Sequence, residues 1–364
     1  MINDLVTDQR VHRTCLTLTE LGYSVTLIGR KLAHSPALDP RPYSTRRMRM
    51  LFTSGPLFYL FFNMRLFFIL LLSKTNLIFA NDLDTLAACR LASTWKNIPL
   101  IYDSHEIFCE VPELVNRKFK QSVWRWLEKR IFPKLKHIIT VNASIADHFT
   151  RLYGVKIEVV RNIPAFVRPD RIKSRQELGL PIDKFIIIVQ GSGINIHRGT
   201  EELLLAIRSV PDAVLLIVGS GDVLSELKRM SVEHGLKEKV IFIPRKPFME
   251  MIHYTLNADL GATLDKDTNI NYRFSLPNKL FDYLHCGIPV LASDLVEVAG
   301  IINQYKVGVI IRDQTPDTIA GAIQDLIRDK ERYSGLKKNT IHAAAELNWK
   351  KESETLRKVI SSCG

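Results

Sequence analysis

Two segments of this sequence combine glycines or helix-starting residues with a cation that could hold a phosphate. In VQGSGINIHRGTEELLLAI (189–207) an apolar strand is followed by a glycine-containing loop and a helix. A helix N-terminus offers unpaired N–H groups, Gly191 and Gly193 would let a phosphate approach the backbone, and Arg198 could clamp a diphosphate. The Walker pattern is absent, and an ordinary tight turn would have a similar sequence.

The second segment is SLPNKLFDYLHCGIPVL (275–291). Pro277 suits the first turn of a helix, so Asn278 and Lys279 would lie near a helix N-terminus, where Lys279 could reach a phosphate. Asp282 follows one turn later and could accept hydrogen bonds from ribose hydroxyls. The alternative is a simple helix start in which Asp282 offsets the helix dipole.

A third segment, IYDSHE (101–106), places a histidine between carboxylates where a strand is expected to end. There His105 could hydrogen-bond a sugar or phosphate or move a proton, although Asp103 and Ser104 could equally cap a helix beside a solvated histidine. No second histidine or cysteine stands at metal-ligand spacing and no GxSxG motif occurs, so we expect neither a metal site nor a hydrolase triad.

The elements that must position these residues alternate between short apolar strands and helical patterns. The expected strands are SVTLIG, LIFA, LIYD, HIITV and IEVV in the first half, and FIIIVQ, AVLLIV, VIFI, ADLGA, PVLA and VGVII in the second. Such alternation predicts parallel sheets. The pattern occurs twice, on either side of a proline-containing linker at 159–174. We therefore expect an α/β protein of two Rossmann-like, doubly wound domains that face a ligand-binding cleft.

The first of these domains is expected to be incomplete at its start. A doubly wound domain opens with a buried strand, but only Met1 and Ile2 precede the polar NDLVTDQ. Either the first strand is very short and apparently truncated, or the true start lies upstream. We favour the upstream start.

Charge and hydropathy indicate a surface for polyanions or membranes on the first domain. Residues 1–165 hold 23 Lys and Arg against 13 Asp and Glu, whereas residues 166–364 hold 27 against 25. The apolar stretch 56–74 is too short and too polar at Asn63 and Arg65 for a clear membrane span. It predicts a helix packed on the sheet, with an outer face that could touch a membrane.

The basic, aromatic stretch 117–137 could lie on an anionic bilayer or be a solvated face. No nucleic-acid-binding motif is found. The cysteines, scattered and five in number, favour a reducing compartment.

These motifs, in this order, resemble the family 4 glycosyltransferases, which have the GT-B fold. The resemblance covers nearly the whole chain, and its most specific parts are YDSHE and PNKLFDYLHCGIPV, which are similar to members that build bacterial surface polysaccharides. It implies an N-terminal acceptor-binding domain of residues 1–165, completed by a C-terminal helix at 347–364, and a nucleotide-sugar-binding domain of residues 166–346. It also implies a cytoplasmic enzyme, peripheral on the inner face of the membrane.

The resemblance implies sugar transfer from a nucleotide-sugar donor, with retention at the anomeric carbon and without a metal or other cofactor. The donor nucleotide, UDP or GDP, is left open; the acceptor would be a glycan or lipid-linked molecule. The residues that it assigns are catalytic His105, Arg198 and Lys279; donor-binding Gly191, Ser192, Gly193, Arg198, Ser275, Leu276, Pro277, Asn278, Lys279 and Asp282; and acceptor-side Asn3, Asp4 and Glu106.

Two positions depart from the family pattern. Ser192 replaces the first member of a basic pair on the diphosphate, and Phe274 replaces a glutamate that touches the donor sugar. Two other hypotheses stay open: an epimerase-like or phosphorylase-like enzyme of the same fold, and a non-catalytic basic binding protein.

Overall fold

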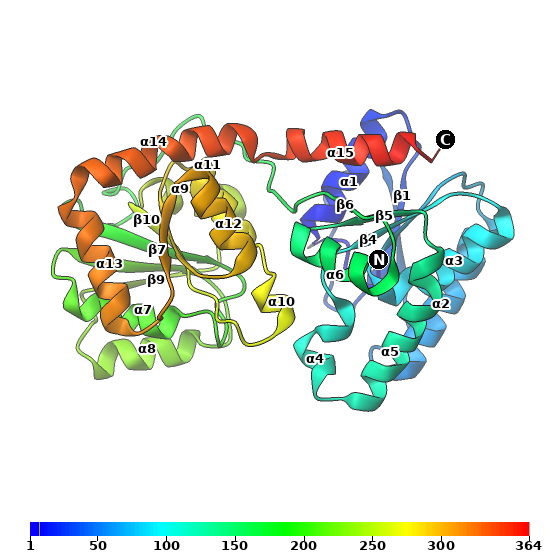
Figure 1. Cartoon of the computed structure of the whole chain (residues 1–364), viewed down its shortest axis with the longest axis horizontal. Helices are drawn as coiled ribbons and strands as arrows, with labels where there is room; N and C mark the ends of the chain where they lie inside the picture. Colours follow the sequence, from blue (N-terminus) through cyan, green and yellow to red (C-terminus); the bar gives the residue numbers. More distant parts are fainter. Residues whose placement is uncertain (7, 364) are drawn as a thin grey trace. The chain divides into compact units, whose positions relative to one another are not determined.

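The computed structural model describes residues 1–6 and 8–363, which form two compact units. Unit 1 comprises Met1–Asn162 and Trp349–Gly364, and unit 2 comprises Ile163–Asn348 (Figure 1). Each unit is a parallel α/β layered structure.

Unit 1 contains two separate parallel sheets. One pairs β1 (Thr26–Lys31) with β2 (Ser44–Arg49), and the other has the order β3 (Ile78–Asn81), β4 (Leu100–Ser104), β5 (His137–Thr140), β6 (Glu158–Val159). The apolar runs of the sequence predicted all of these strands except β2. Its sequence, STRRMR, is mostly exposed, so it has no apolar pattern to mark it.

The N-terminal residues lie along the edge of β1 that β2 leaves open. Asp4 forms a parallel bridge with Arg30, the Met1 amino group donates to the Ile28 carbonyl at 3.0 Å, and Arg30 N–H donates to the Asn3 carbonyl at 3.3 Å. Among the described residues no strand lies between β1 and β3. In these residues the pairing with β1 consists of this single bridge and the two hydrogen bonds beside it.

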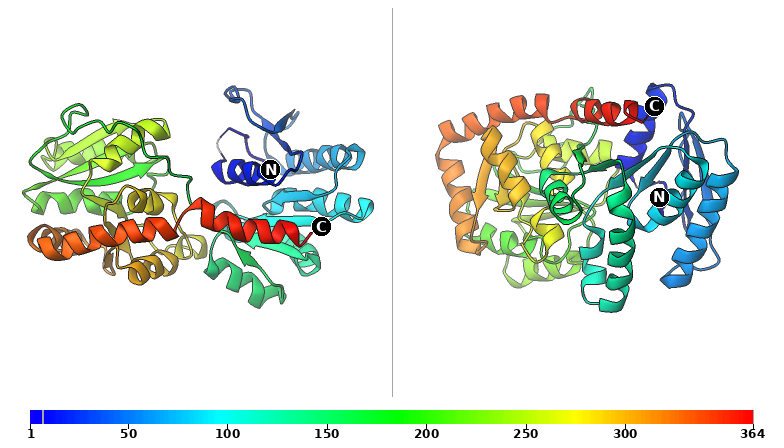
Figure 2. Two further views of the ribbon diagram at one scale, coloured as in Figure 1. Left: turned by 90° about the horizontal axis from the view of Figure 1, so that it is seen from above. Right: turned by 45° about the vertical axis from the view of Figure 1, so that its right-hand side comes forward.

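The helices of unit 1 cover these sheets. They are α1 (Gln9–Glu20), α2 (Gly55–Leu72), α3 (Leu83–Lys96), α4 (Pro112–Val115), α5 (Lys118–Ile131), α6 (Ala143–Tyr153) and α15 (Trp349–Ser361), with short 3₁₀ turns at Phe108–Glu110 and Phe132–Lys134. The C-terminal α15 packs beside α1 (Figure 2) and buries Leu356, Val359 and Ile360 against Ile101 and Ile139 of the sheet. The last helix thus contributes to the core of the first unit.

Unit 2 contains one unbroken sheet of six parallel strands. Their order is β12-β11-β10-β7-β8-β9, formed by β7 (Phe185–Gly191), β8 (Ala213–Gly219), β9 (Val240–Pro244), β10 (Leu260–Thr263), β11 (Val290–Ser293) and β12 (Gly308–Ile311). Successive strands are added on one side of β7 until β9, and then on the other side from β10. The chain therefore reverses direction across the sheet between β7 and β10, and in open α/β sheets this switch point is where ligands bind.

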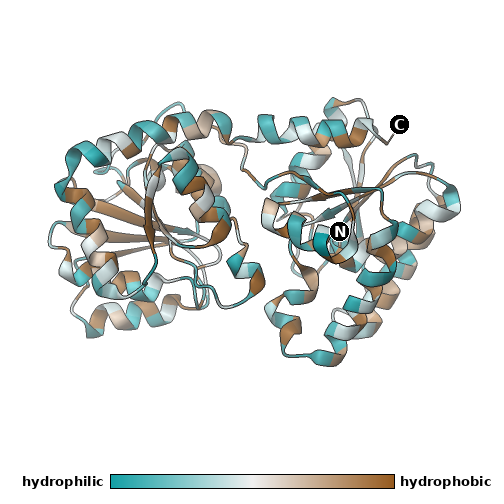
Figure 3. Cartoon of the chain, in the orientation of Figure 1, coloured by the Kyte–Doolittle hydropathy of each residue, from teal (hydrophilic) through white to brown (hydrophobic). Residues whose placement is uncertain are grey.

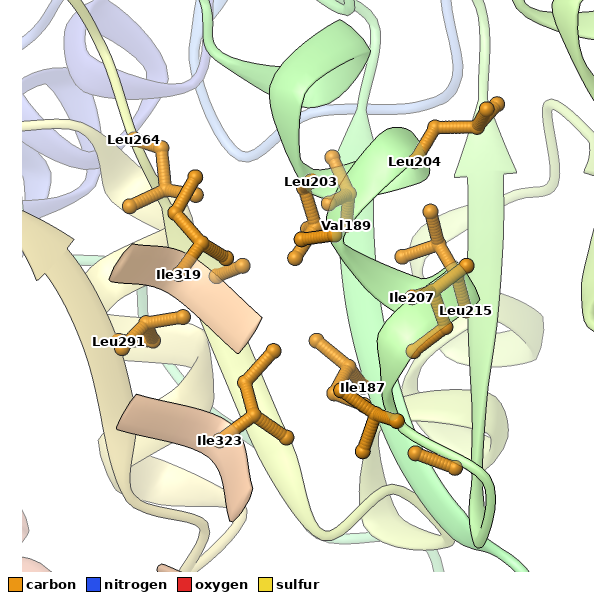
Figure 4. Close-up of a cluster of buried hydrophobic side chains, with 14 of the residues drawn as sticks. Ile187, Val189, Leu203, Leu204, Ile207, Leu215, Leu264, Leu291, Ile319 and Ile323 are labelled. Atoms are coloured by element: carbon orange, nitrogen blue, oxygen red, sulfur yellow. The ribbon is translucent and has the colours of Figure 1, made fainter. Parts of the chain in front are cut away.

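The alternation of side chains along each strand builds a core on both faces of this sheet. Ile187 and Val189 point to the cluster that includes α7 and α13, whereas Ile186 and Ile188 point to the cluster that includes α11 and α12. Figure 4 shows the first cluster, and Figure 3 shows the strands as apolar ribbons. The helices of unit 2 are α7 (Thr200–Ala206), α8 (Leu224–Glu233), α9 (Phe248–Leu256), α10 (Ile270–Arg273), α11 (Asn278–His285), α12 (Val296–Tyr305), α13 (Pro316–Arg328) and α14 (Lys330–Glu346), with a 3₁₀ turn at Ile207–Ser209.

Candidate functional site

The carboxyl ends of β7 and β8 form two interlocked turns in unit 2. Ser220 N–H donates to the Gly191 carbonyl at 3.0 Å, and Ile194 N–H donates to the Ser220 carbonyl at 3.1 Å. A Cβ on Gly219 would lie 1.8 Å from the Gly191 carbonyl oxygen, so only glycine fits there. Ser192 and Gly193 are exposed at the top of this arrangement, where a ligand could reach their backbone.

Arg198 comes from the same loop, just before α7. The helix itself begins at Thr200, is one and a half to two turns long, and has Glu201 and Glu202 in its first turn. These carboxylates already lie at the positive end of the helix dipole. The arginine, rather than the helix end, is therefore the feature of this loop that can attract an anion.

Arg198 and Lys279 both lie near one buried carboxylate, that of Asp265, which follows β10. Arg198 Nη1 is 2.8 Å from Asp265 Oδ1, and Lys279 Nζ is 3.8 Å from Asp265 Oδ2. Thr263 and Asp265 also interact, at 3.2 Å between Oγ1 and Oδ2, and the guanidinium of Arg198 lies over the Tyr272 ring at 4.3 Å. The loops after β7 and β10 therefore meet at the switch point through an ion pair.

The electrostatics of this group leave positive charge at the site. Burial opposes the charge on Arg198, but Asp265 more than offsets this, so the pKa of Arg198 is raised. Burial lowers the pKa of Lys279, and the neighbouring Arg198 lowers it further, against the pull of Asp265. One carboxylate cannot balance two cations, so an incoming anion would relieve their repulsion.

The turn into α11 brings more donors to the same region. Pro277 precedes the helix, Asn278 is exposed at its first position, and Ser275, Leu276 and Pro277 are half-buried. Ser275 Oγ has no hydrogen-bond partner among the described residues, and the first N–H groups of a helix lack partners within it. The structure thus brings Arg198, Lys279 and the start of α11 together around Asp265.

Asp282 lies deeper than its proposed ribose contact requires. Its side chain is buried in α11, and Gln190 Nε2 donates to Asp282 Oδ2 at 3.1 Å. Phe274 ends α10 and is half-buried. The contact of Asp282 with a ribose stays a prediction, and a ligand would have to reach it past the start of α11.

In unit 1, His105 is enclosed by carboxylates at the ends of two adjacent strands. Its Nδ1 is 3.2 Å from Asp82 Oδ2 and its Nε2 is 3.3 Å from Asp103 Oδ2, while its backbone N–H donates to Asp82 Oδ1 at 3.0 Å. Burial alone would lower the pKa of His105, but Asp82 and Asp103 raise it well above its usual value. The raised pKa favours the protonated form of His105, whose positive charge the two carboxylates balance.

The carboxylates around His105 differ in their charge. Burial would raise the pKa of Asp103, but Arg10 and His105 lower it to about 2; Arg10 binds it with two hydrogen bonds, of 2.7 and 2.9 Å. Burial and the nearby Asp82 raise the pKa of Asp84 to about 8. Asp82 itself adopts a left-handed backbone conformation, with φ of 60°, at the start of α3. Such strain persists only where surrounding contacts hold it.

The three residues assigned to the acceptor side differ in their exposure and in their hydrogen-bond partners in unit 1. Asp4 contacts Ser35 and Arg47, with Arg47 Nη2 2.9 Å from Asp4 Oδ1. Burial opposes the charge on Asp4, but these partners and the Val6 N–H hold its pKa below the usual value. Asn3 and Glu106 are exposed and free to meet a ligand.

Sequence reasoning missed Asp82, Asp265, Tyr272 and Gln190. Asp82 directly follows the LIFAN run and Asp265 follows the ADLGAT run. A search for carboxylates just past each expected strand would have found both, since parallel strands end at one edge. Tyr272 and Gln190 reach the site only because the fold brings distant segments together, and no local sequence pattern indicates them.

Two family models together match almost the whole chain. Glycosyltransferase Family 4 matches residues 8–171, and Glycosyl transferases group 1 matches residues 170–343. The chain belongs to the family 4 glycosyltransferases.

Sequence relatives of this glycosyltransferase carry related names. A D-inositol 3-phosphate glycosyltransferase of Nocardia farcinica is 26% identical over 290 residues, which are 72% of this chain and 60% of the relative. A GDP-mannose-dependent alpha-(1-6)-phosphatidylinositol monomannoside mannosyltransferase of Mycolicibacterium smegmatis is 28% identical over 194 residues, 50% of this chain and 48% of the relative. The chain thus spans about half to three-fifths of these relatives.

Solved structures confirm the fold of this glycosyltransferase. Sucrose-phosphate synthase from Thermosynechococcus elongatus has a TM-score of 0.78 at 18% identity, covering 97% of this chain and 92% of the other. Anabaena HepE in complex with UDP has a TM-score of 0.74 at 17% identity, covering 96% of both chains. These neighbours are GT-B glycosyltransferases, so the expected GT-B architecture is confirmed.

Proposed function

We propose that this glycosyltransferase moves a sugar from a nucleotide-sugar donor to a glycan or lipid-linked acceptor, with retention and without a metal. The observation that carries the proposal is the convergence of Arg198 and Lys279 on Asp265 at the switch point of unit 2. A site with surplus positive charge beside the start of a helix suits a nucleoside diphosphate. The presence of UDP in the HepE structure supports a donor of this class.

In the proposed reaction the two cations act on the leaving group. As the bond between the anomeric carbon and the diphosphate oxygen breaks, negative charge grows on that oxygen. Arg198 and Lys279 are held in place by Asp265 before the reaction, so they can stabilise this charge without reorganising. Preorganised electrostatic stabilisation of this kind is usually the largest single catalytic contribution.

His105 would act on the transferred sugar or on the acceptor. Asp82 and Asp103 face its two ring nitrogens and orient it, so in its protonated form it would act on the ligand mainly through its positive charge. The raised pKa of His105 makes it a poor general base at neutral pH, so we assign it to binding and charge stabilisation.

For the acceptor we favour a lipid-linked molecule at an anionic membrane surface, on the cytoplasmic face. By length and composition α2 alone, among the described helices, could cross a bilayer. It buries Phe58, Phe62, Leu66 and Leu70 in unit 1, however, and Asn63 hydrogen-bonds the Asp84 carbonyl of α3. We therefore treat α2 as a surface helix with one buried stripe, not as a span.

The opposite side of α2 forms an apolar ridge, defined by exposed Leu57, Leu60, Phe61, Met64, Phe68 and Leu72. The basic helix α5 contacts α2 from the other side, where the rings of Tyr59 and Trp124 are 5.1 Å apart. On α5 the exposed Phe119, Val123 and Trp126 lie among exposed basic residues. An apolar ridge beside a basic helix is the composition that binds anionic bilayers, and the phosphatidylinositol name of one relative supports this choice.

A donor screen tests the catalytic proposal. The protein is incubated with UDP- and GDP-sugars and acceptor lipids, and nucleoside diphosphate release is measured. We expect release with one donor, and Arg198→Ala and Lys279→Ala to lose roughly 2–4 kcal/mol of transition-state stabilisation each. Arg229→Ala, which removes an exposed arginine of α8, is the matched control. Sugar isomerisation without acceptor would indicate the epimerase alternative, and no donor binding would indicate the binding protein.

Vesicle sedimentation tests the membrane surface separately. We expect binding to phosphatidylglycerol vesicles, little binding to phosphatidylcholine vesicles, and weaker binding for Phe119→Ser and Phe68→Ser. The control Ile341→Ser removes an equally exposed apolar residue from unit 2. Equal sedimentation of all variants would contradict the assignment of this surface.

A further inference from the structure

A cavity of about 390 Å³ lies in unit 2 at the carboxyl ends of β10, β11 and β12. Residues at or just past these strand ends line it, together with the first turn of α7. The lining includes Glu202, Lys266, Ser293, Leu295, Arg312 and Gln314. Its volume lies in the range of pockets that bind small molecules, about 300–1,000 Å³.

The cavity and the candidate diphosphate site lie on two sides of one loop, the loop after β10. The Asp265 carboxylate faces Arg198 and Lys279. The Asp265 carbonyl instead accepts a hydrogen bond from Gln314 Nε2 of the cavity at 3.3 Å. Neither Arg198 nor Lys279 lines the cavity, so it is a separate place for a ligand beside the candidate diphosphate site.

Three buried oxygen atoms in this lining have no hydrogen-bond partner in the part of the chain that the structure describes. They are Ser293 Oγ, Glu202 Oε2 and Gln314 Oε1. Ser293 is 1% exposed, whereas the other two residues are half-buried. Buried side-chain oxygens in folded proteins are nearly always paired, and leaving one unpaired is costly. The lining therefore suits a ligand that donates hydrogen bonds.

The main charged groups of the lining are paired with one another. Glu202 forms an ion pair with Lys266, and Asp294 Oδ2 lies 3.4 Å from Arg312 Nε. Each pair holds one charge of each sign, in contrast to the surplus of cations at the candidate diphosphate site. Two further carboxylates of the lining are exposed to solvent, those of Asp267 and Asp313. A neutral ligand rich in hydrogen-bonding groups therefore fits this cavity better than a phosphate does.

We propose that this cavity is a second sugar-binding site, which holds an uncharged sugar unit of the glycan acceptor through its hydroxyl groups. A hydroxyl both donates and accepts, so a sugar can pair with the Ser293 hydroxyl and with the carboxylate and amide oxygens beside it. Leu295, which is 3% exposed, offers an apolar wall to the C–H groups of the ring. The sugar's membership of an acceptor rests on the proposed function, but its binding does not. A second attachment point would strengthen the binding of a longer glycan.

The test measures hydrogen exchange at residues 293–295 and 312–315 while a sugar is titrated into the full chain. The probes are the methyl α-glycosides of glucose, galactose, mannose and N-acetylglucosamine, with inorganic phosphate and spermidine as charged alternatives. Ser293→Ala removes a hydroxyl without a partner, so the thermal unfolding of the free protein should not change. Gln314→Met is a second variant of the lining. Ser231→Ala, which removes a similarly buried hydroxyl of α8 outside the cavity, is the matched control.

We expect at least one glycoside to slow exchange in both segments with saturation. Ser293→Ala and Gln314→Met should each weaken its binding by about tenfold, and Ser231→Ala should leave it unchanged. Should one variant of the lining fail to fold, the other decides. No protection by any glycoside, or equal protection in the natural protein and these variants, overturns the proposal. Protection by phosphate or spermidine alone overturns the choice of a neutral ligand.

The same measurement separates this site from the proposed function. Sugar binding at the cavity of a protein that releases nucleoside diphosphate from no donor would overturn the proposed function and keep the sugar site. Donor-dependent release, with exchange at the cavity unaffected by every glycoside, would overturn the sugar site and keep the proposed function.

Discussion

In both units of this glycosyltransferase a cation and a carboxylate that follow adjacent strands form an ion pair. The two ion-pair networks differ in how far they are buried from solvent. In unit 2 a cation after β7, Arg198, pairs with a carboxylate after the adjacent β10. In unit 1 a cation after β4, His105, pairs with a carboxylate after the adjacent β3. Parallel strands make this possible, because neighbouring strands end side by side and their following residues meet.

The difference lies in a second carboxylate of unit 1, Asp103 of β4, which also faces His105. Asp103 is fully enclosed and is bound by Arg10, whose side chain is 3% exposed, whereas the Arg198 side chain on Asp265 is 23% exposed. In unit 1 the Arg10–Asp103 ion pair is closed off from solvent. The network in unit 2 keeps surplus positive charge within reach of solvent. We infer that the closed network mainly positions His105, and that the open one binds an anion.

The largest expected effect tests this contrast between closed and open networks. Asp103→Ala should destabilise unit 1 by about 3–5 kcal/mol, since it leaves a buried Arg10 without its counter-charge. Asp265→Ala should lower the stability of unit 2 by less than this, and added pyrophosphate should restore part of the lost stability by taking the place of the carboxylate.

All four tryptophans, at positions 95, 124, 126 and 349, lie in unit 1, so their fluorescence in guanidinium reports that unit alone. Hydrogen exchange reports unit 2. Pyrophosphate rescue of Asp103→Ala would contradict the contrast.

The next effect is pH-dependent and concerns His105. Its pKa is raised in the folded protein above the unfolded value of about 6.5, so the folded state keeps a proton that the unfolded state loses. Protonated His105 contributes about 1.5–3 kcal/mol to the free energy of unfolding. This contribution is fully present below the unfolded pKa and is lost as the pH rises through the folded pKa. We expect the stability difference between the natural protein and His105→Gln to shrink on going from pH 6 to alkaline pH. The tryptophan signal measures it, and a difference that grows with pH would be inconsistent with a cationic His105.

A pair of glycine substitutions sharpens the comparison within unit 2. Gly219→Ala should destabilise the turns after β7 and β8 by about 1–3 kcal/mol, because φ is +149° and the new Cβ would meet the Gly191 carbonyl. Gly193→Ala should be nearly neutral, since a Cβ there meets nothing within 4 Å. Thermal unfolding of unit 2, followed by hydrogen exchange, distinguishes them. Equal stability of the two variants would contradict the steric requirement for glycine at position 219.

The smallest effect concerns the attachment of α15 to unit 1. Glu20→Ala removes the partner of Arg357 from an exposed ion pair and should cost less than about 1 kcal/mol. The buried Leu356 of the same helix is the reference, and Leu356→Ala should cost about 2–5 kcal/mol. Tryptophan fluorescence in guanidinium measures both. A larger loss for Glu20→Ala than for Leu356→Ala would mean that ionic rather than apolar contacts hold α15.

The sequence by itself determined the two-domain α/β architecture and much of the candidate site. Its apolar runs marked eleven of the twelve strands found in the part of the chain that the structure describes. Its loops marked Arg198, Lys279 and His105, because buried parallel strands and helix starts have strong local signals. The exposed strand β2 has none, and it was missed.

Only the tertiary structure decided which charges meet. Asp265 and Asp82 are far in sequence from the cations that they bind, and their pairing depends on strand order, which no local pattern encodes. The burial of Asp282 against Gln190 and the cavity at the ends of β10, β11 and β12 are likewise set by packing across the sheet. The sequence therefore specified the groups available for chemistry, and the order of the strands specified their partners, their burial and hence their charge.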